Sequence, residues 1–228
     1  MLNQRAVISF TFDDFPHSAV SNGARILNKY NARGTFYVVG SYSGRVVDGV
    51  SQYSLEDLST VVARGHEIGC HTFHHPRVST LTASALRQEV YLNAKYVAGY
   101  FPNFVMRTFA YPYGDVSPSA ARKLGRQFSG CRSSDPGLNV GRVDLAMLRS
   151  VRLYERLMNR QAVSEVIQET IDRNAWLIFY THDVADEASN VGCTPSLFEH
   201  AVRAASMSGA AILPVCETIA AISSASLR

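Results

Sequence analysis

The stretch AVISFTFDD, residues 6–14, is an apolar run that ends in two adjacent aspartates. Its apolar part is short and rich in β-branched and aromatic residues, as expected for a buried β-strand. Further apolar runs recur along the chain, and amphipathic helical stretches separate most of them. These runs cover residues 34–40, 66–70, 105–111, 129–134, 146–154, 175–184 and 211–215. Strands that alternate with helices predict a parallel sheet covered by helices.

The number of apolar runs and the length of the chain favour one α/β domain. A parallel sheet of about eight strands within 228 residues fits a (β/α) barrel, which we predict first. An open doubly wound sheet is the alternative. The hydrophobic content of 46% is enough for one sizeable core, and no repeat or Pro/Gly/Ser-rich linker marks a boundary. We therefore expect residues 1–228 to form a single domain.

The net charge, the apolar stretches and the cysteines indicate which partners and which cellular compartment to expect. A net charge of +3 without any run of Lys or Arg does not indicate binding to nucleic acid or to an anionic membrane. No apolar stretch approaches the ~20 residues needed to span a bilayer. The first residues lack the apolar region of a secretory signal, so we expect a cytoplasmic protein. Four scattered cysteines are expected to be reduced and mostly buried: Cys70, Cys131, Cys193 and Cys216. The oligomeric state cannot be read from the sequence.

Polar and ionisable residues gather where the predicted strands end. In a barrel of this kind, functional side chains lie at the carboxyl ends of the strands. The relevant segments are Asp13–Asp14, HTFHHP (71–76), AYPYGD (110–115), RSSDPG (132–137) and THD (181–183). We therefore expect these segments to meet at one end of the barrel.

The histidines of HTFHHP have the spacing of metal ligands. His71 and His75 are four residues apart, so one helical turn would bring both imidazoles to the same side. Two histidines from one turn and a carboxylate from another strand form an open metal site that leaves room for water and substrate. The spacing alone also allows His74 as the ligand instead of His75.

The two aspartates then receive separate roles. If Asp14 binds a divalent cation, Asp13 can lie beside it, because the cation dominates the local charge. Asp13 would take a proton from an attacking water whose pKa the cation lowers. His182 ends a markedly apolar strand and suits a general acid that protonates a leaving amine. Together these residues predict metal-assisted hydrolysis of an amide or an ester.

With these residues the chain resembles the polysaccharide deacetylases, carbohydrate esterase family four, also known as the NodB-homology domain. TFDD (11–14), HTFHHP (71–76), YPYG (111–114) and YTHD (180–183) resemble four motifs of that family in the same order. The resemblance implies a distorted (β/α) barrel of seven or eight strands. It implies a divalent cation, usually zinc and sometimes cobalt or nickel, held by Asp14, His71 and His75 rather than His74.

The same resemblance implies the roles of the catalytic groups. Asp13 would be the base and His182 the acid. The backbone N–H of Tyr113 would help to stabilise the oxyanion of the tetrahedral intermediate. Tyr180 stands where the family has an apolar residue that lines the pocket for the acetyl methyl group.

Two departures from the family pattern affect the surroundings of these groups. Ala110 stands where the third motif usually has an arginine that pairs with the base, and we expect Arg132 to replace it from the next strand end. The fourth motif, Asp-x-x-Asp-Trp, is absent, and the only tryptophan is Trp176. We expect Asp135 to orient His182 instead, with Asp183 as the competing candidate.

Three functions are compatible with these residues. The first is removal of N-acetyl groups from N-acetylated sugars of an oligo- or polysaccharide. The second keeps the metal site and hydrolyses an O-acetyl ester or another C–N bond. The third is a metal-bearing carbohydrate-binding protein without turnover. We prefer the first, because a protein that had lost catalysis would be free to lose Asp13 and His182.

Overall fold

The computed structural model describes residues 5–225. Seven parallel strands form the barrel: β1 (Val7–Phe12), β2 (Thr35–Val38), β5 (Glu67–Cys70), β6 (Thr108–Ala110), β7 (Gly130–Pro136), β8 (Leu148–Arg152) and β9 (Trp176–Thr181). β9 pairs with β1 through six residue pairs, from Val7–Trp176 to Phe12–Thr181, and this pairing closes the sheet. The predicted distorted barrel is thus confirmed, and the open sheet considered as an alternative is wrong.

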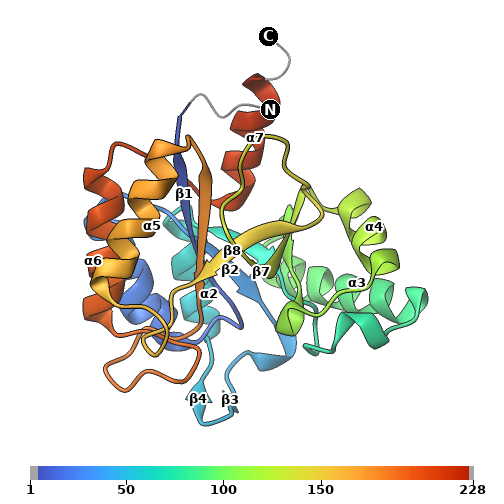
Figure 1. The fold of residues 1–228 in the computed structure, drawn as a ribbon. Coiled ribbons are helices and arrows are strands. Elements are labelled where there is room, and N and C mark those ends of the chain that lie inside the picture. The colour runs from blue at the N-terminus through green and yellow to red at the C-terminus, as the bar shows by residue number, and fades with distance from the viewer. Residues whose placement is uncertain (1–4, 226–228) are drawn as a thin grey trace.

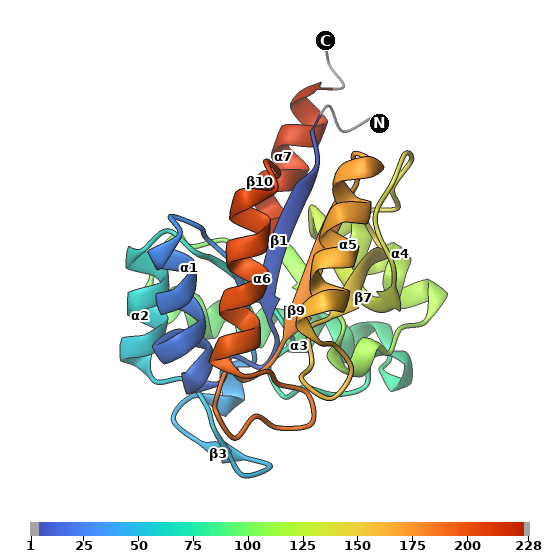
Figure 2. The same cartoon turned by 60° about the vertical axis from the view of Figure 1, so that its left-hand side comes forward.

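Helices cover the outside of the barrel (Figures 1 and 2). They are α1 (Arg25–Lys29), preceded by a π-helical turn (Ala19–Ala24), α2 (Leu55–Ala63), α3 (Ala83–Tyr100), α4 (Pro118–Gln127), α5 (Arg160–Asp172) and α6 (Pro195–Met207). Five of these helices, α2 to α6, begin at a side chain that accepts a backbone N–H, as in the capping box formed by Ser54 and Asp57 of α2. The strand–helix order follows the predicted one.

Strand β1 is buried on both faces. The rings of Phe10 and Phe12 pack outward on Phe198 of α6, with centroids 5.6 and 5.4 Å apart. Inside the barrel, the Ser9 hydroxyl accepts a hydrogen bond of 3.0 Å from the indole N–H of Trp176. A strand covered on both sides needs apolar residues along its whole length, which explains the continuous apolar run in the sequence.

Helix α7 (Val215–Ala225) lies at the amino-terminal end of the strands, opposite the hairpin of β3 (Val46–Val47) and β4 (Val50–Ser51) (Figure 1). It follows the short strand β10 (Ala211–Ile212), which pairs with the beginning of β1. The first N–H groups of α7 donate to the barrel: Val215 to the Thr35 hydroxyl at 3.0 Å and Cys216 to the Glu67 carboxylate at 2.9 Å. This end of the barrel is therefore closed by hydrogen bonds to the helix N-terminus.

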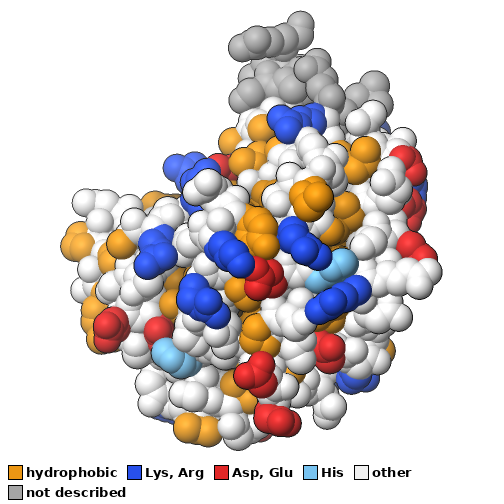
Figure 3. Space-filling view, turned by 90° about the vertical axis from the view of Figure 1, so that its left-hand side faces the viewer, with side chains coloured by type: hydrophobic (Ala, Val, Ile, Leu, Met, Phe, Trp, Pro, Cys, Tyr) orange, Lys and Arg blue, Asp and Glu red, His pale blue; other side chains and the backbone are white. Residues whose placement is uncertain are grey.

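The remaining features concern the surface and the cysteines. No helix within residues 5–225 is long and apolar enough to cross a membrane. On the outer face seen in Figure 3, basic and acidic side chains are interspersed. Between α1 and α6, Lys29 forms an ion pair with Glu199 at 2.5 Å. Three of the four cysteines are buried, in line with the expectation, and Cys216 is half-buried.

Candidate active site

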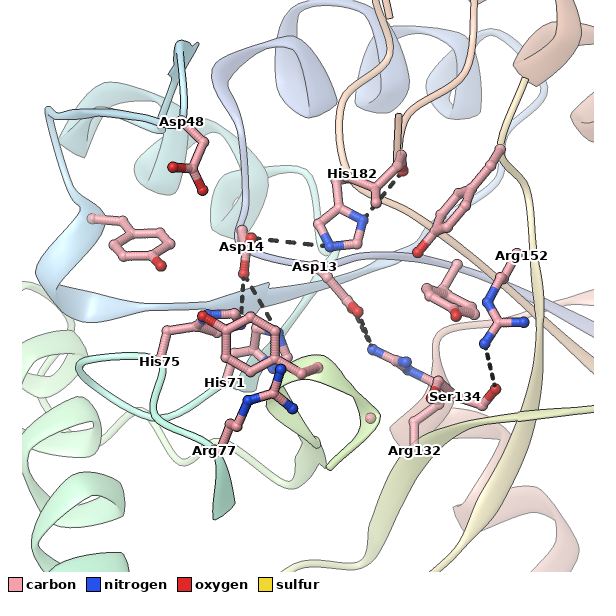
Figure 4. Close-up of a pocket in the computed structure, with 16 residues that line it drawn as sticks. Asp13, Asp14, Asp48, His71, His75, Arg77, Arg132, Ser134, Arg152 and His182 are labelled. Carbon is pink, nitrogen blue, oxygen red and sulfur yellow. Dashed lines mark hydrogen bonds and ion pairs between the residues drawn. The ribbon is translucent and has the colours of Figure 1, made fainter. Parts of the chain in front are cut away.

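The predicted site segments meet at the carboxyl ends of the strands around a cavity of about 480 Å³ (Figure 4). The cavity is lined by Asp13, Asp14, Tyr42, Asp48, His71, His75, Arg77, Tyr113, Gly114, Arg132, Ser134, Arg152, Tyr154, Tyr180, His182 and Val191. These residues come from the loops after β1, β2, β5, β6, β8 and β9 and from the carboxyl-terminal parts of β7, β8 and β9, as the barrel geometry predicts.

Three potential metal ligands converge on one side of the cavity. Asp14 Oδ1 lies 3.5 Å from His71 Nε2 and 3.2 Å from His75 Nε2. A tetrahedral ion with bonds of about 2.0–2.1 Å keeps its ligand atoms roughly 3.3 Å apart, so these separations suit one small cation. One ligand atom from each residue lies within 4.8 Å of the others.

The hydrogen bonds of His71 show why this arrangement favours a cation. Its Nδ1 lies 2.8 Å from the carbonyl oxygen of Ala110, so Nδ1 carries the proton and Nε2 faces Asp14 with a lone pair. Burial lowers the pKa of His71 to about 4, which keeps the imidazole neutral near pH 7. Asp14 Oδ1 is buried and has no hydrogen-bond partner in the described chain. Two electron-rich atoms facing each other need a positive ion between them, so the residues present fit a bound metal.

The loop after β5 is shaped by hydrogen bonds that aim the histidines. The Thr72 hydroxyl accepts the backbone N–H of His75 at 3.1 Å. Glu89 of α3 accepts the backbone N–H groups of Phe73 and His74 at 3.0 and 2.8 Å. The His74 imidazole is exposed and also bonds Glu89, at 2.8 Å. The structure therefore turns His74 away from the cavity and His75 into it.

The backbone is strained at several of these positions. Asp14, His75 and Tyr113 have φ values of 62°, 58° and 59°, a left-handed conformation that costs energy for residues other than glycine. Thr72, between the two histidines, has φ 65°, which is unusual for a β-branched residue. Strain of this kind concentrates at functional sites, where the surrounding structure imposes it.

Asp13 forms a buried ion pair with Arg132, which reaches across from β7. Both side chains are nearly inaccessible, at 6% and 1% exposed. Burial raises the pKa of the Asp13 carboxyl, but the Arg132 guanidinium, with His71 and His182, outweighs burial and holds that pKa below its ordinary value. Asp13 is therefore ionised and oriented. The arginine absent at Ala110 is replaced in space by the one that the sequence suggested.

His182 meets a partner that the sequence did not suggest. Its Nδ1 lies 3.2 Å from the carbonyl oxygen of Val191, and its Nε2 lies 4.0 Å from Asp14 Oδ2. Asp135, expected to orient His182, is exposed on β7 and does not line the cavity. Asp183, the competing candidate, is buried but accepts hydrogen bonds from Ser189 instead. Neither predicted pairing is formed, because the loop after β9 folds back and offers a backbone carbonyl first.

Tyr113 and Tyr180 both line the cavity and contact different groups there. The Tyr113 ring is 60% exposed and packs 4.5 Å from the His75 ring, measured between centroids. Tyr180 is buried, and the Arg132 guanidinium lies 4.6 Å from its ring centroid. Its ring also meets that of Tyr154 at 5.4 Å, edge to face. This part of the cavity wall is aromatic, and the Arg132 guanidinium, which also orients Asp13, holds it in place.

Comparison with known families identifies the chain. The model of a family described as polysaccharide deacetylase matches residues 3–129, more than half of the sequence. The chain belongs to this family. The match contains Asp13, Asp14, His71, His75 and the YPYG segment, but ends before Arg132 and His182.

Among its curated relatives are two deacetylases of bacterial cell walls. The chain is 32% identical over 122 residues to peptidoglycan-N-acetylglucosamine deacetylase PgdA of Listeria monocytogenes, covering 52% of this chain and 24% of the relative. It is 35% identical over 119 residues to peptidoglycan-N-acetylmuramic acid deacetylase PdaC of Bacillus subtilis, covering 50% and 23%. The chain thus spans about a quarter of the length of these relatives.

Solved structures show the same fold. A family 4 acetyl xylan esterase from Clostridium thermocellum, in complex with a cobalt ion, aligns with a TM-score of 0.66 at 20% identity. The alignment covers 94% of this chain and 90% of the esterase. The barrel is therefore that of the family over nearly the whole chain.

Six residues of this family member's cavity lie outside the segments predicted from the sequence. They are Tyr42, Asp48, Arg77, Arg152, Tyr154 and Val191. Two of them had a usable signal: Arg77 follows the histidine motif directly, and Arg152 ends a predicted strand. Asp48 sits at the tip of the hairpin of β3 (Val46–Val47) and β4 (Val50–Ser51), in an Asp-Gly turn typical of such hairpins.

Proposed function

We propose that residues 1–228 form one metal-dependent hydrolase domain that removes N-acetyl groups from N-acetylated sugars of an oligo- or polysaccharide. The main support is that Asp14 faces the neutral imidazoles of His71 and His75 beside the ionised, buried Asp13. The deacetylase activities printed for the curated relatives support this choice. The domain extends past the family match, because β9 closes the barrel and brings His182 to the cavity.

Asp14, His71 and His75 would hold the divalent cation, which is Zn²⁺ in this proposal, with Co²⁺ or Ni²⁺ as substitutes. When bound, such a cation lowers the pKa of a water molecule and polarises a carbonyl oxygen. Three protein ligands leave coordination positions open, as a catalytic site requires.

Asp13 acts as the general base in this proposal. It takes the proton of the attacking water, and the Arg132 guanidinium keeps its carboxylate ionised and oriented until then. The backbone N–H of Tyr113 donates to the oxyanion of the tetrahedral intermediate.

His182 acts as the general acid. The Val191 carbonyl accepts from its Nδ1, which leaves Nε2 facing the cavity and able to protonate the leaving amine nitrogen. Tyr180 lines the space for the acetyl methyl group. The C–N bond breaks, acetate leaves, and the sugar keeps a free amine.

The test is acetate release from N-acetylated chitooligosaccharides by the purified protein, with metal content measured on the same sample. We expect release that a chelator abolishes and added Zn²⁺ restores. His182→Ala should retain the metal and lose release, and His75→Ala should lose both. Absence of metal from the wild-type protein would contradict the proposal. Release from O-acetylated but not N-acetylated sugars would make it an esterase.

A further inference from the structure

Two arginines at the edge of the cavity have no role in the proposed chemistry. Arg77 and Arg152 are exposed, line the cavity, and form no ion pair with any acid among residues 5–225. In Figure 4 they lie at the lower and right-hand edges of the site, while Asp48 lies at the upper left. The charge of the cavity rim is therefore divided between two sides.

A continuous strip of contacts connects the two arginines. The Arg77 guanidinium lies 4.7 Å from the ring centroid of Tyr113. Gly114 comes next and touches Ser134 so closely that a Cβ on Gly114 would lie 1.8 Å from the Ser134 hydroxyl. The carbonyl oxygen of Ser134 in turn accepts a hydrogen bond of 3.5 Å from Arg152. The strip thus has a guanidinium at each end.

The groups along the strip are ready to donate hydrogen bonds. The Ser134 hydroxyl makes no hydrogen bond to any described residue, and Arg152 uses one N–H on Ser134. Asp115 lies beyond the strip. Its carboxylate accepts the backbone N–H of Ser79 at 2.8 Å, and this bonding and, to a smaller extent, the Arg77 charge lower its pKa, but it forms no ion pair with Arg77. A guanidinium with free N–H groups binds carboxylate and phosphate oxygens in pairs.

The charge of the whole cavity points the same way. Three aspartates and three arginines line it, so their formal charges cancel. A divalent cation on Asp14, His71 and His75 would leave the cavity positive. Asp48, on the opposite rim, would repel an anion from the hairpin side and favour the strip.

We propose that the preferred substrate carries an anionic group, a carboxylate or a phosphate, which binds along the strip between Arg77 and Arg152. This proposal rests on the proposed function, since it names the class of acetylated sugar. The acetyl group lies at the metal ligands, and the anion lies over the ends of β6 to β8.

The test compares sugars of equal length that differ in charge. Acetate release is measured from N,N′-diacetylchitobiose, from the disaccharide of N-acetylglucosamine and N-acetylmuramic acid, and from N-acetylglucosamine with and without a phosphate. We expect kcat/KM to be at least about tenfold higher for a charged sugar than for its neutral counterpart, as befits charge-assisted hydrogen bonds. The pair of sugars that differ by a carboxylate and the pair that differ by a phosphate show which of the two anions the protein prefers.

Variants locate the effect. Arg152→Gln and Arg77→Gln should each lower the ratio of kcat/KM between charged and neutral sugars about tenfold. Arg149→Gln removes the same charge from the same strand outside the cavity and should leave the ratio unchanged. Equal ratios in wild type and all three variants would overturn the proposal.

A binding measurement separates this proposal from the proposed function. Calorimetry of the same sugars with Asp13→Asn, alone and combined with Arg152→Gln, reports affinity without turnover. One outcome is that the protein binds the charged sugar more tightly, that Arg152→Gln abolishes this preference, and that the wild type releases no acetate. This outcome would support the anion site and contradict the deacetylase activity. Acetate release with no preference in rate or affinity would do the opposite.

Discussion

The two ends of the barrel each bury a carboxylate, and the two carboxylates behave differently. Asp13, at the carboxyl ends of the strands, is paired with Arg132, and its pKa lies below the ordinary value despite burial. Glu67, at the amino-terminal end, accepts only from neutral donors: the hydroxyls of Thr35 and Thr108 and one N–H of α7. Burial raises the pKa of Glu67, and these hydrogen bonds offset it only in part.

The difference shows what each end is built for. Neutral dipoles satisfy a buried acid without fixing its charge, which suits a helix cap. A guanidinium fixes the charge, which suits a base that must be ionised before substrate arrives. Burial is similar at the two sites, so the nature of the partner decides the outcome.

Replacement of the two acids should separate their roles most strongly. Asp13→Asn should lower kcat by roughly 10²–10⁴-fold with the metal retained, because a positioned base contributes that much. Glu67→Gln should leave kcat unchanged, because Glu67 lies at the other end of the barrel. Kinetics and metal analysis of both variants are the measurement; full activity of Asp13→Asn would remove it as the base.

Removal of the guanidinium should make Asp13 resemble Glu67. Arg132→Met should lower the rate about 10²-fold, a part of what the base contributes, without loss of metal. Since the guanidinium then no longer opposes burial, the pKa of Asp13 rises, and the rate should begin to fall at a higher pH on acidification. Arg132→Lys should recover part of the activity. If Arg132→Met leaves the pH–rate profile unchanged, then Arg132 only fills space.

The proposed metal ligands His71 and His75 depend on the loop after β5, which Glu89 holds through hydrogen bonds. Glu89→Gln weakens the acceptor for the N–H groups of Phe73 and His74, so we expect about tenfold weaker metal binding, similar to other outer partners of metal ligands. Competition with a chelator measures this affinity. Glu165→Gln on α5 is the matched control, and equal affinity for both variants would exclude a positioning role for Glu89.

The amino-terminal end should determine stability rather than rate. Burial lowers the pKa of His66 to about 4, and its Nδ1 accepts the N–H of Gly34 at 3.0 Å. The unfolded chain therefore binds the proton first, and the free energy of unfolding falls as the pH drops from about 6.5 to 4.

His66→Asn keeps an acceptor and removes the titration. The loss of stability between pH 7 and 4.5 should then be smaller by ~1–3 kcal/mol, as measured by chemical denaturation. The variant His200→Asn, on α6, controls for the change in composition. An identical pH dependence in wild type and His66→Asn would contradict the assignment.

Much of this architecture was readable because its signals are local. Barrel strands buried on both faces appear as largely apolar runs, so the strand order followed from the sequence, and with it the strand ends that carry Asp14 and the histidine motif. The choice of His75 over His74 came from the family resemblance. Arg132 was predictable for a related reason: neighbouring strands bring their ends together, and Ala110 left a place for a cation.

The rest could not be predicted, because its signals are not local or are not carried by side chains. The partner of His182 is the backbone carbonyl of Val191, which any residue would provide. Asp135 looked suitable by position, yet the end of β7 exposes it. Glu89 acts from a helix 15 residues away from His74. The Asp48–Gly49 turn had a signal, but its two-residue strands were too short to be noticed.

The closing pair of the barrel, β1 with β9, has a consequence for the order of folding. Val7 pairs with Trp176, so the pairing that brings His182 to Asp13 joins segments far apart in the chain. Contacts of such long range form late, because the intervening loop must be closed first. A nascent chain would therefore bring together the proposed metal ligands before it adds His182, the proposed proton donor. On this proposal, the site is complete only when the first and last long strands meet.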